Sequence, residues 1–327
     1  MSAVRALILR RELAPAVAFG LLLTAVAVVA PAFFTATNLR DLALNNASVL
    51  LVSVGMTLVI LLGEIDISVG AQFAVCSVVT GTLAASGVPA LMLLPCAMLT
   101  GCVLGALNGV LIGVLGLPSI VVTLAMLVAW RDLLRWTTQG AWITGLPADF
   151  QWFGFSAAGA LWMIVGIAVA VLLAAAWALR TLRVGRAIYA VGSDRDAAHL
   201  AGIPTSRVVT VVFTLTGALV GLAAALNAVR FDAVPSNAGV GLEMKAIAAV
   251  VVGGVAITGG RGTLLGTLIG VCLLGTIGTA LSFVGINPYW EKAIQGAIIL
   301  AALVSGTVLG RLSIRAGGSG HACVAAK

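Results

Sequence analysis

The chain is 327 residues long, and its composition excludes an ordinary soluble domain. Hydrophobic residues make up 61% of it and charged residues only 9%, with a mean hydropathy of +1.17. Soluble domains carry about 25% charged residues, so this chain has too few polar side chains to cover a surface in water. The apolar runs are continuous rather than alternating, which excludes a transmembrane β-barrel. The sequence predicts an all-α polytopic membrane protein, with residues 1–327 forming a single transmembrane domain.

Ten apolar segments are expected to cross the membrane, where a spanning helix needs about 20 residues. The second and eighth segments, 48–62 and 244–258, are short enough to be broken or re-entrant helices, and with both re-entrant the count falls to eight. The connections 32–47, 138–157 and 230–243 are expected on the outer side. The expected crossings are 13–31, 48–62, 67–86, 90–115, 118–137, 158–179, 208–229, 244–258, 263–284 and 290–308.

Positive charge is concentrated in three places, and this distribution predicts orientation. Residues 1–12 carry a net charge of +2, the loop 180–207 carries +3, and the tail, about 309–327, carries +3, while the remaining residues carry −1. Lys and Arg favour cytoplasmic loops, so both termini and the loop 180–207 are expected in the cytoplasm. An even number of crossings fits this arrangement. The arginines are not interleaved with base-stacking aromatics, so no nucleic acid partner is expected.

The loop 180–207 contains the signals of one short helix. Ser193 or Asp194 is suited to cap its N-terminus, and Gly202 and Pro204 are suited to end it. The helix is expected from about Asp194 to Ala201, roughly 12 Å long. A helix this short is marginal in water. Its small apolar side chains favour docking into a groove on another protein, and a solvated loop with one ordered turn is the alternative.

Two acids interrupt the apolar sequence at 63–70, which reads GEIDISVG. A carboxylate near the bilayer centre costs about 2.5–3.5 kcal/mol. Glu64 and Asp66 cannot share one helix face, so this segment is expected to be unwound or at a membrane boundary. The acids either line a solute path, or form a gate with a cation such as Arg131 or Arg261. The alternative is a tight connection at the cytoplasmic surface in which both acids are hydrated.

Small and neutral polar residues are spread through the expected helices. Four glycines from Gly101 to Gly113 recur every fourth residue and favour close helix packing. Two short, glycine-punctuated segments in the two halves of the chain are typical of repeat-built transporters. Neutral polar side chains suit a neutral polyhydroxylated solute, although such groups often bond only to neighbouring helices. Those within apolar segments include Thr57, Asn108, Thr123 and Asn227.

Enzyme signatures are missing from the sequence. Its two histidines are not in a zinc-binding pair, its five cysteines have no metal-type spacing, and it has no Gly-x-Ser-x-Gly elbow. None of its three lysines lies in a P-loop. We therefore expect no catalytic residue, metal or cofactor, and an ATPase that drives transport would be another polypeptide.

Several motifs in order resemble permease subunits of bacterial ABC importers for monosaccharides, of the ribose type. GEIDISVG at 63–70 resembles GGIDLSVG, and LPSIVVTLAML at 117–127 resembles PPFIVTLGTM. GRAIYAVGSDRDAAHLAGI at 185–203 resembles GRYIYAIGGNEEAARLSGI, and the segments 239–254 and 259–270 resemble the second-half signature. GAWITGLPADF and GLEMKAIAA are similar to autoinducer-2 permeases, and rhamnose permeases are close relatives. The chain departs from the ribose pattern at position 64, where Glu replaces Gly.

The resemblance implies partners and a location. It implies that the segment from Gly192 to Gly202, with Asp194 as cap and Ala197 at the contact, docks on an ABC ATPase subunit. It also implies a second permease copy or paralogue, a periplasmic or extracellular sugar-binding protein at the outer loops, and contact with membrane lipid. The expected location is the bacterial cytoplasmic (inner) membrane.

The sequence as a whole predicts the transmembrane subunit of an ATP-driven importer for a monosaccharide or similar small polyol. The alternatives are a gradient-driven carrier or channel for a small neutral solute, and an autoinducer-2 importer permease. The residues expected at the transport path or gate are Gly63, Glu64, Asp66, Ser68, Gly70, Asn108 and Thr123.

Overall fold

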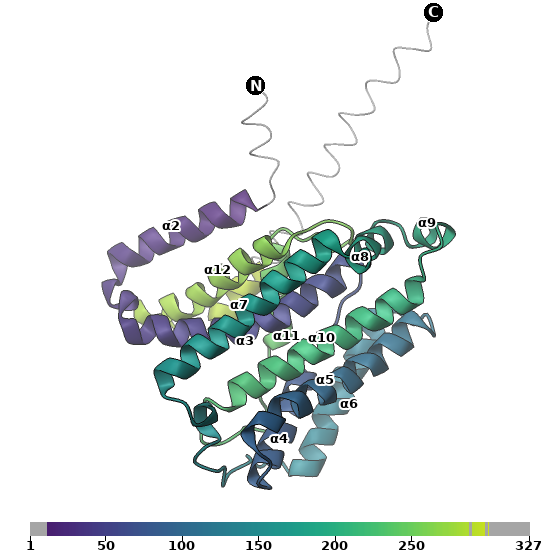
Figure 1. Ribbon diagram of the computed structural model, residues 1–327. Helices are drawn as coiled ribbons and strands as arrows, with labels where there is room; N and C mark the ends of the chain where they lie inside the picture. Colours follow the sequence, from purple (N-terminus) through teal and green to yellow (C-terminus); the bar gives the residue numbers. More distant parts are fainter. Residues whose placement is uncertain (1–11, 288–289, 298–299, 301–327) are drawn as a thin grey trace, which may run out of the picture.

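The computed structural model describes residues 12–287, 290–297 and 300. The long helices run roughly side by side in one bundle, with two short helices, α8 and α9, at one end (Figure 1). We call this end the α9 end and the opposite one the far end. The elements are α2 Leu13–Val29, η1 Pro31–Phe34, α3 Ala36–Leu61, α4 Val69–Ala85, α5 Ala90–Gly113, α6 Ser119–Thr138, η2 Gln151–Gly154, α7 Ala157–Thr181, α8 Arg183–Ser193, α9 Arg195–Leu200, α10 Thr205–Ala228, α11 Leu242–Val252 and α12 Leu264–Phe283.

These elements confirm an all-α polytopic membrane protein. Among the residues that the structure describes, five helices, α3, α5, α7, α10 and α12, are long and apolar enough to cross a membrane, and α2 and α4 are shorter apolar helices of 17 residues. Apart from the second, eighth and tenth, the expected crossings each match a helix to within three residues at either end. Of the expected tenth crossing, residues 290–297 are helical. The rest of that segment, most of residues 1–12 and the tail 309–327 lie outside the described residues.

The second crossing is longer than expected. The helix α3 has 26 residues, about 39 Å, so the expected short span 48–62 and the expected loop 32–47 were wrong. Polar side chains in the first half of α3 lower its hydropathy. This half of the helix nevertheless contains no Gly or Pro that would break it, since the first such residue in α3 is Gly55. These side chains find partners on other elements, because Arg230 donates to Asn45 Oδ1 at 2.9 Å and Arg40 donates to the carbonyl oxygen of Ala157 at 3.1 Å.

Two connections meet at the far end. Ile143 and Val234 form an isolated antiparallel bridge, with N–H···O distances of 2.9 and 3.0 Å. Ser236 also donates to the carbonyl oxygen of Gly140. The connections expected on the outer side at 138–157 and 230–243 therefore lie together, about 36 Å along α10 from α9.

The eighth crossing is short, as expected. The helix α11 has 11 residues, about 16 Å, and begins just after the far-end connection. The chain then runs without helix to Gly260, whose N–H donates to the carbonyl oxygen of Leu61 at 2.9 Å, at the α9 end. This crossing is therefore broken rather than re-entrant.

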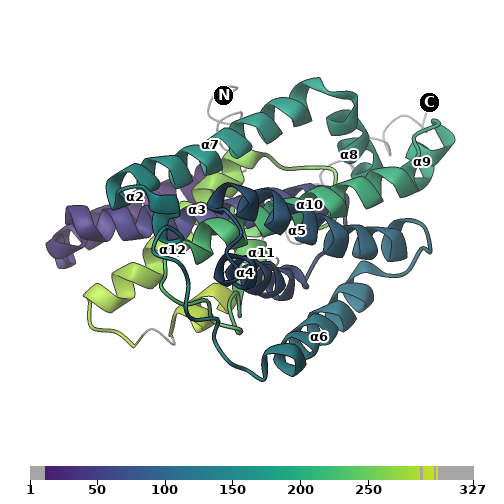
Figure 2. The ribbon, with the colours of Figure 1, turned by 60° about the horizontal axis from the view of Figure 1, so that its bottom comes forward.

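The centre of the bundle is formed by α3 and α10. In their most apolar 18-residue stretches, 89% and 72% of the residues are buried, whereas in those of α5 and α7 only 22% are buried. Figure 2 shows α7 and α6 on opposite flanks of the bundle. The helix α10 packs along α5, where the backbone of Gly101 meets that of Gly217 so closely that a side chain on either residue would clash. This contact confirms the glycine packing face expected on α5.

Candidate functional site

The connection between α3 and α4, residues 62–68, begins with a glycine that ends α3. Gly63 has φ +80°, a conformation that favours glycine. Its N–H donates to the carbonyl oxygen of Ile60 at 2.9 Å, and Glu64 N–H donates to that of Val59 at 3.2 Å. This pair of bonds is the Schellman pattern that closes a helix C-terminus. It turns the chain sharply and places Glu64 at the α9 end of the bundle.

Asp66 organises a buried polar network beyond this turn. Its Oδ1 accepts hydrogen bonds from the N–H and the hydroxyl of Ser68, and its Oδ2 accepts from Gln72 Nε2 at 3.1 Å. Ser68 Oγ in turn accepts from Gln72 Nε2 and from Asn108 Nδ2, each at 2.9 Å. All four side chains are 0% exposed. The network therefore ties the first turn of α4 to α5.

The carboxyl group of Asp66 has no cation among the described groups that bond to it. Burial raises its pKa above the ordinary value, and the hydrogen bonds from Ser68 and Gln72 offset part of this effect. The interpretation in which both acids are hydrated is therefore wrong for Asp66, because the carboxyl group is completely enclosed.

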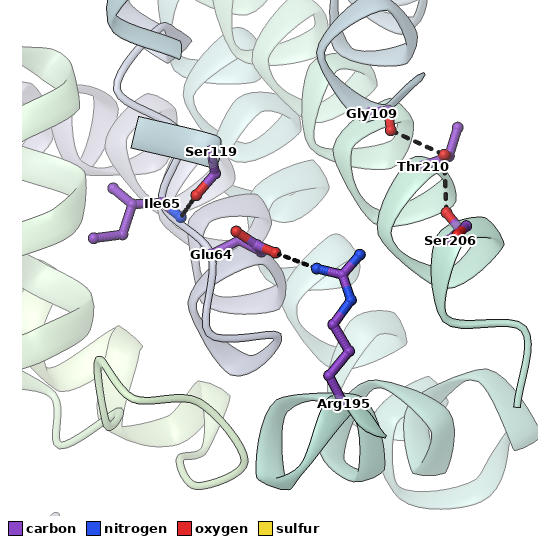
Figure 3. A network of polar contacts seen from close by, with 7 residues as sticks. All are labelled: Glu64, Ile65, Gly109, Ser119, Arg195, Ser206 and Thr210. Atoms are coloured by element: carbon purple, nitrogen blue, oxygen red, sulfur yellow. Dashed lines mark hydrogen bonds and ion pairs between the residues drawn. The ribbon is translucent and has the colours of Figure 1, made fainter. Parts of the chain in front are cut away.

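Ile65 joins the same loop to α6. Its N–H donates to Ser119 Oγ at 3.3 Å, and its carbonyl oxygen accepts from Thr123 Oγ1 at 3.3 Å (Figure 3 shows the first of these contacts). Thr123 also donates to the carbonyl oxygen of Ser119 one turn earlier. The loop 62–68 is therefore bonded through its backbone to α6 and through its side chains to α4 and α5.

Gly70 lies in a second polar contact. The space where its side chain would be is filled by the carboxylate of Glu243 on α11. Glu243 Oε1 accepts from the N–H of Gly241 at 3.1 Å, and Arg131 donates to the carbonyl oxygen of Ala238 at 2.9 Å. Close approach between α4 and the start of α11 thus requires glycine at position 70.

The segment expected to dock on another protein is helical. It contains two helices, one more than expected. The helix α8 precedes α9, and Asp194 caps α9 by accepting from the N–H of Ala197 at 2.9 Å. Gly202 ends α9 with φ +81°. The expected short helix is therefore confirmed. Ala198 is buried against the bundle, while Ala197 is exposed and Leu200 is 88% exposed at the tip.

Gly192 holds the junction of α8 and α9 against the end of α3. A side chain on Gly192 would clash with the carbonyl group of Leu61 and the amide nitrogen of Gly260. Gly259, with φ +83°, lies in turn against the backbone of both Gly192 and Gly63. Three backbone segments distant in the sequence therefore meet at a distance that only glycine allows.

An ion pair beside this packed junction joins the loop 62–68 to α9. Arg195 Nη1 lies 3.2 Å from Glu64 Oε1, so the arginine at the start of α9 reaches the loop 62–68 (Figure 3). The Glu64 side chain is 15% exposed and that of Arg195 is 43% exposed. The expected pairing of this loop with Arg131 or Arg261 was wrong for Glu64, because the turn at Gly63 directs it towards α9.

The structure brings most of the expected path residues together. Gly63, Glu64, Asp66 and Ser68 lie in the loop 62–68, and it contacts Asn108 and Thr123, whereas Gly70 faces α11. Within the described residues these side chains are packed and bonded to their neighbours, as are Thr57 and Thr267, whose hydroxyl oxygens are 2.7 Å apart. Their role in a transport path stays a prediction.

Sequence reasoning missed Gln72, Arg195 and the structural part played by Gly259 and Gly260. Gln72 had a usable signal, since it is an amide in an apolar helix one turn after Ser68. Arg195 had none, because its partner is 131 residues away in the sequence.

The fold and this loop describe a polytopic α-helical membrane protein with a helical projection at one end. Residues 38–303 match a family model described as branched-chain amino acid transport system / permease component. The chain belongs to this permease family.

Curated relatives cover most of the chain. It is 34% identical to the ribose import permease protein RbsC of Escherichia coli strain K12, over 88% of this chain and 91% of that protein. It is 37% identical to the autoinducer 2 import system permease protein LsrC of Escherichia coli O9:H4 strain HS, over 80% and 76%. It is 36% identical to LsrC of Yersinia pseudotuberculosis serotype O:1b, over 80% and 74%. No solved structure matches the chain.

Proposed function

We propose that this chain is the membrane-spanning subunit of an ATP-driven importer and that α9 is its docking element for the ATPase subunit. The observation that carries the proposal is the projection of α9 from the bundle. Its free face, with Ala197 and Leu200, is exposed, while its base is anchored to the α3–α4 loop. The sequence has no nucleotide-binding P-loop, so hydrolysis belongs to a separate polypeptide.

The proposed solute is a monosaccharide or similar small polyol. The relatives are a ribose permease and two autoinducer 2 permeases, and the family model is described by branched-chain amino acids, so this family serves chemically different solutes. A neutral polyhydroxylated molecule fits best here, because the neutral polar side chains within the apolar segments of the sequence suit a solute that needs hydrogen bonds and no compensating charge. We place the Asp66 network beside the path as a gating element.

The proposed orientation puts the α9 end in the cytoplasm of a bacterial inner membrane. Glu12, just before α2, contacts Thr263 at the start of α12, and α12 starts at the α9 end. The chain therefore enters the membrane from the side that carries the basic α8–α9 segment, and the positive-inside rule assigns that side to the cytoplasm. A solute-binding protein would meet the connections at the far end, and a second permease copy or paralogue would complete the path.

The proposed docking predicts that an ATPase co-purifies with the permease from detergent-solubilised membranes. The double variant Ala197→Glu, Gly202→Pro should lose most of the ATPase, because it puts a charge on the exposed face of α9 and removes the residue that ends it. Ala141→Glu, which adds the same charge at an exposed position of the far end, is the control and should retain the ATPase. Equal recovery with all three proteins would reject docking at α9.

A further inference from the structure

The ion pair between Glu64 and Arg195 joins two elements that are 131 residues apart in the sequence. Glu64 Oε1 and Arg195 Nη1 lie 3.2 Å apart, and the Glu64 side chain is only 15% exposed.

The pair joins a projecting helix to the centre of the polar site. Arg195 is the first residue of α9, and Glu64 belongs to the turn that ends α3. The next residue, Ile65, is bonded at both its N–H and its carbonyl group to α6. The residue after that is Asp66, whose carboxyl group binds the first turn of α4. A displacement of Arg195 therefore acts within two residues of contacts to α4 and α6.

The rest of the junction limits where such a displacement can go. Gly192 is packed against Leu61 and Gly260, so the end of α8 cannot slide over α3 without separating their backbones. The helix α9 itself extends beyond this contact and is held there by Ala198 and by the ion pair. Because the Glu64 carboxylate is mostly enclosed, water and salt screen this pair less than a fully exposed one.

We propose that the Glu64–Arg195 pair is a positioning contact that transmits movement of α9 to the α3–α4 loop. The inference rests on the proposed docking of the ATPase at α9. In this proposal, neither residue contacts the solute or the nucleotide. The attraction between their opposite charges makes the loop 62–68 move together with α9 while the bundle changes between its two access states.

Charge reversal tests this contact in the full complex of permease, ATPase and solute-binding protein in proteoliposomes. The readout is uptake of radiolabelled ribose, or of autoinducer-2 if the wild type transports only that, per ATP hydrolysed. Glu64→Arg and Arg195→Glu should each lower this ratio about fivefold or more, the size of a typical coupling between sites. The double variant Glu64→Arg, Arg195→Glu restores opposite charges and should recover most of the loss. Arg207→Glu, an exposed reversal at the start of α10, should leave the ratio unchanged.

Co-purification of the ATPase separates this inference from the proposed function. The single variants leave the exposed Ala197 and Leu200 intact, so they should retain the ATPase and hydrolyse ATP while transporting less. Unchanged uptake per ATP in both single variants, or a double variant no better than the worse single one, overturns the inference and leaves the docking proposal standing. If a reversed charge prevents assembly, Glu64→Gln, Arg195→Gln and their combination test the same coupling, and independent, multiplicative losses would overturn it.

Discussion

Replacing Asp66 by Asn is expected to lower solute uptake about tenfold or more without lowering the amount of permease in the membrane, since an unsatisfied buried donor costs about 1–3 kcal/mol. The Asn side chain can still accept from Ser68, but its amide group would face Gln72 Nε2, which now donates to Asp66 Oδ2 at 3.1 Å. Two donors would then oppose each other in a fully buried site. Removing the carboxyl group also relieves its desolvation, so the fold persists while the link between α4 and α5 changes. Uptake of the radiolabelled solute, normalised to membrane protein by immunoblot, measures the effect.

Two further variants make this prediction specific to the network. Asp66→Asn combined with Gln72→Glu returns an acceptor to the place where the two donors oppose each other, and should recover part of the uptake. Asp132→Asn removes a carboxylate of the same type from an exposed pair with Arg135, where the side chains are 62% and 73% exposed, and should have little effect. Full uptake by Asp66→Asn would show that the network has no role in transport.

Gly192→Ala is expected to destabilise the assembled permease by about 1–3 kcal/mol, the usual cost of overpacking a closed contact. The added methyl group would meet the carbonyl group of Leu61 and the amide nitrogen of Gly260, and backbone atoms cannot move aside as a flexible side chain can. The end of α8 would have to leave the end of α3, and the hydrogen bond from Gly260 to Leu61 would be strained. The melting temperature of the purified protein in detergent and the yield of monodisperse protein measure this effect.

Gly166→Ala provides a matched control on α7. Both positions are helical, so both substitutions gain about 1 kcal/mol of helix propensity. A side chain at Gly166 meets nothing within 4 Å, whereas one at Gly192 meets the backbone. The difference between the two variants therefore isolates the clash. A melting temperature for Gly192→Ala equal to or above that of Gly166→Ala would show that the three backbone segments do not pack this closely.

Hydropathy predicted most helices, because the lipid requires long, continuous apolar segments whose backbone groups bond internally. It failed at α3, whose first half carries Arg40, Asp41 and Asn45. These residues lower the hydropathy but are compatible with a helix when Arg230 and the carbonyl group of Ala157 are available as partners. Hydropathy reports the cost of exposure to lipid, and here tertiary contacts supply the polar partners.

The sequence predicted many of the residues of the candidate site, but it did not predict which residues contact one another. The motif at 63–70 marks a break in the helix because its glycine and acids are poorly suited to a continuous apolar span, and Gly63 does end α3. The partner of Glu64 was not predictable in this way, since the ion pair depends on how α8 crosses α3 at Gly192. That crossing depends on backbone packing between three segments, which no local pattern records.

ATP-driven transport by the reconstituted complex tests the central claim most directly. Permease, ATPase and solute-binding protein are placed in proteoliposomes with ATP on the ATPase side, and uptake of radiolabelled ribose and of autoinducer-2 is followed with and without ionophores that dissipate proton and sodium gradients. We expect any uptake of these solutes to require ATP hydrolysis and to be unaffected by the ionophores. Uptake that proceeds without ATP and stops when a gradient is dissipated would contradict the importer assignment and identify a gradient-driven carrier.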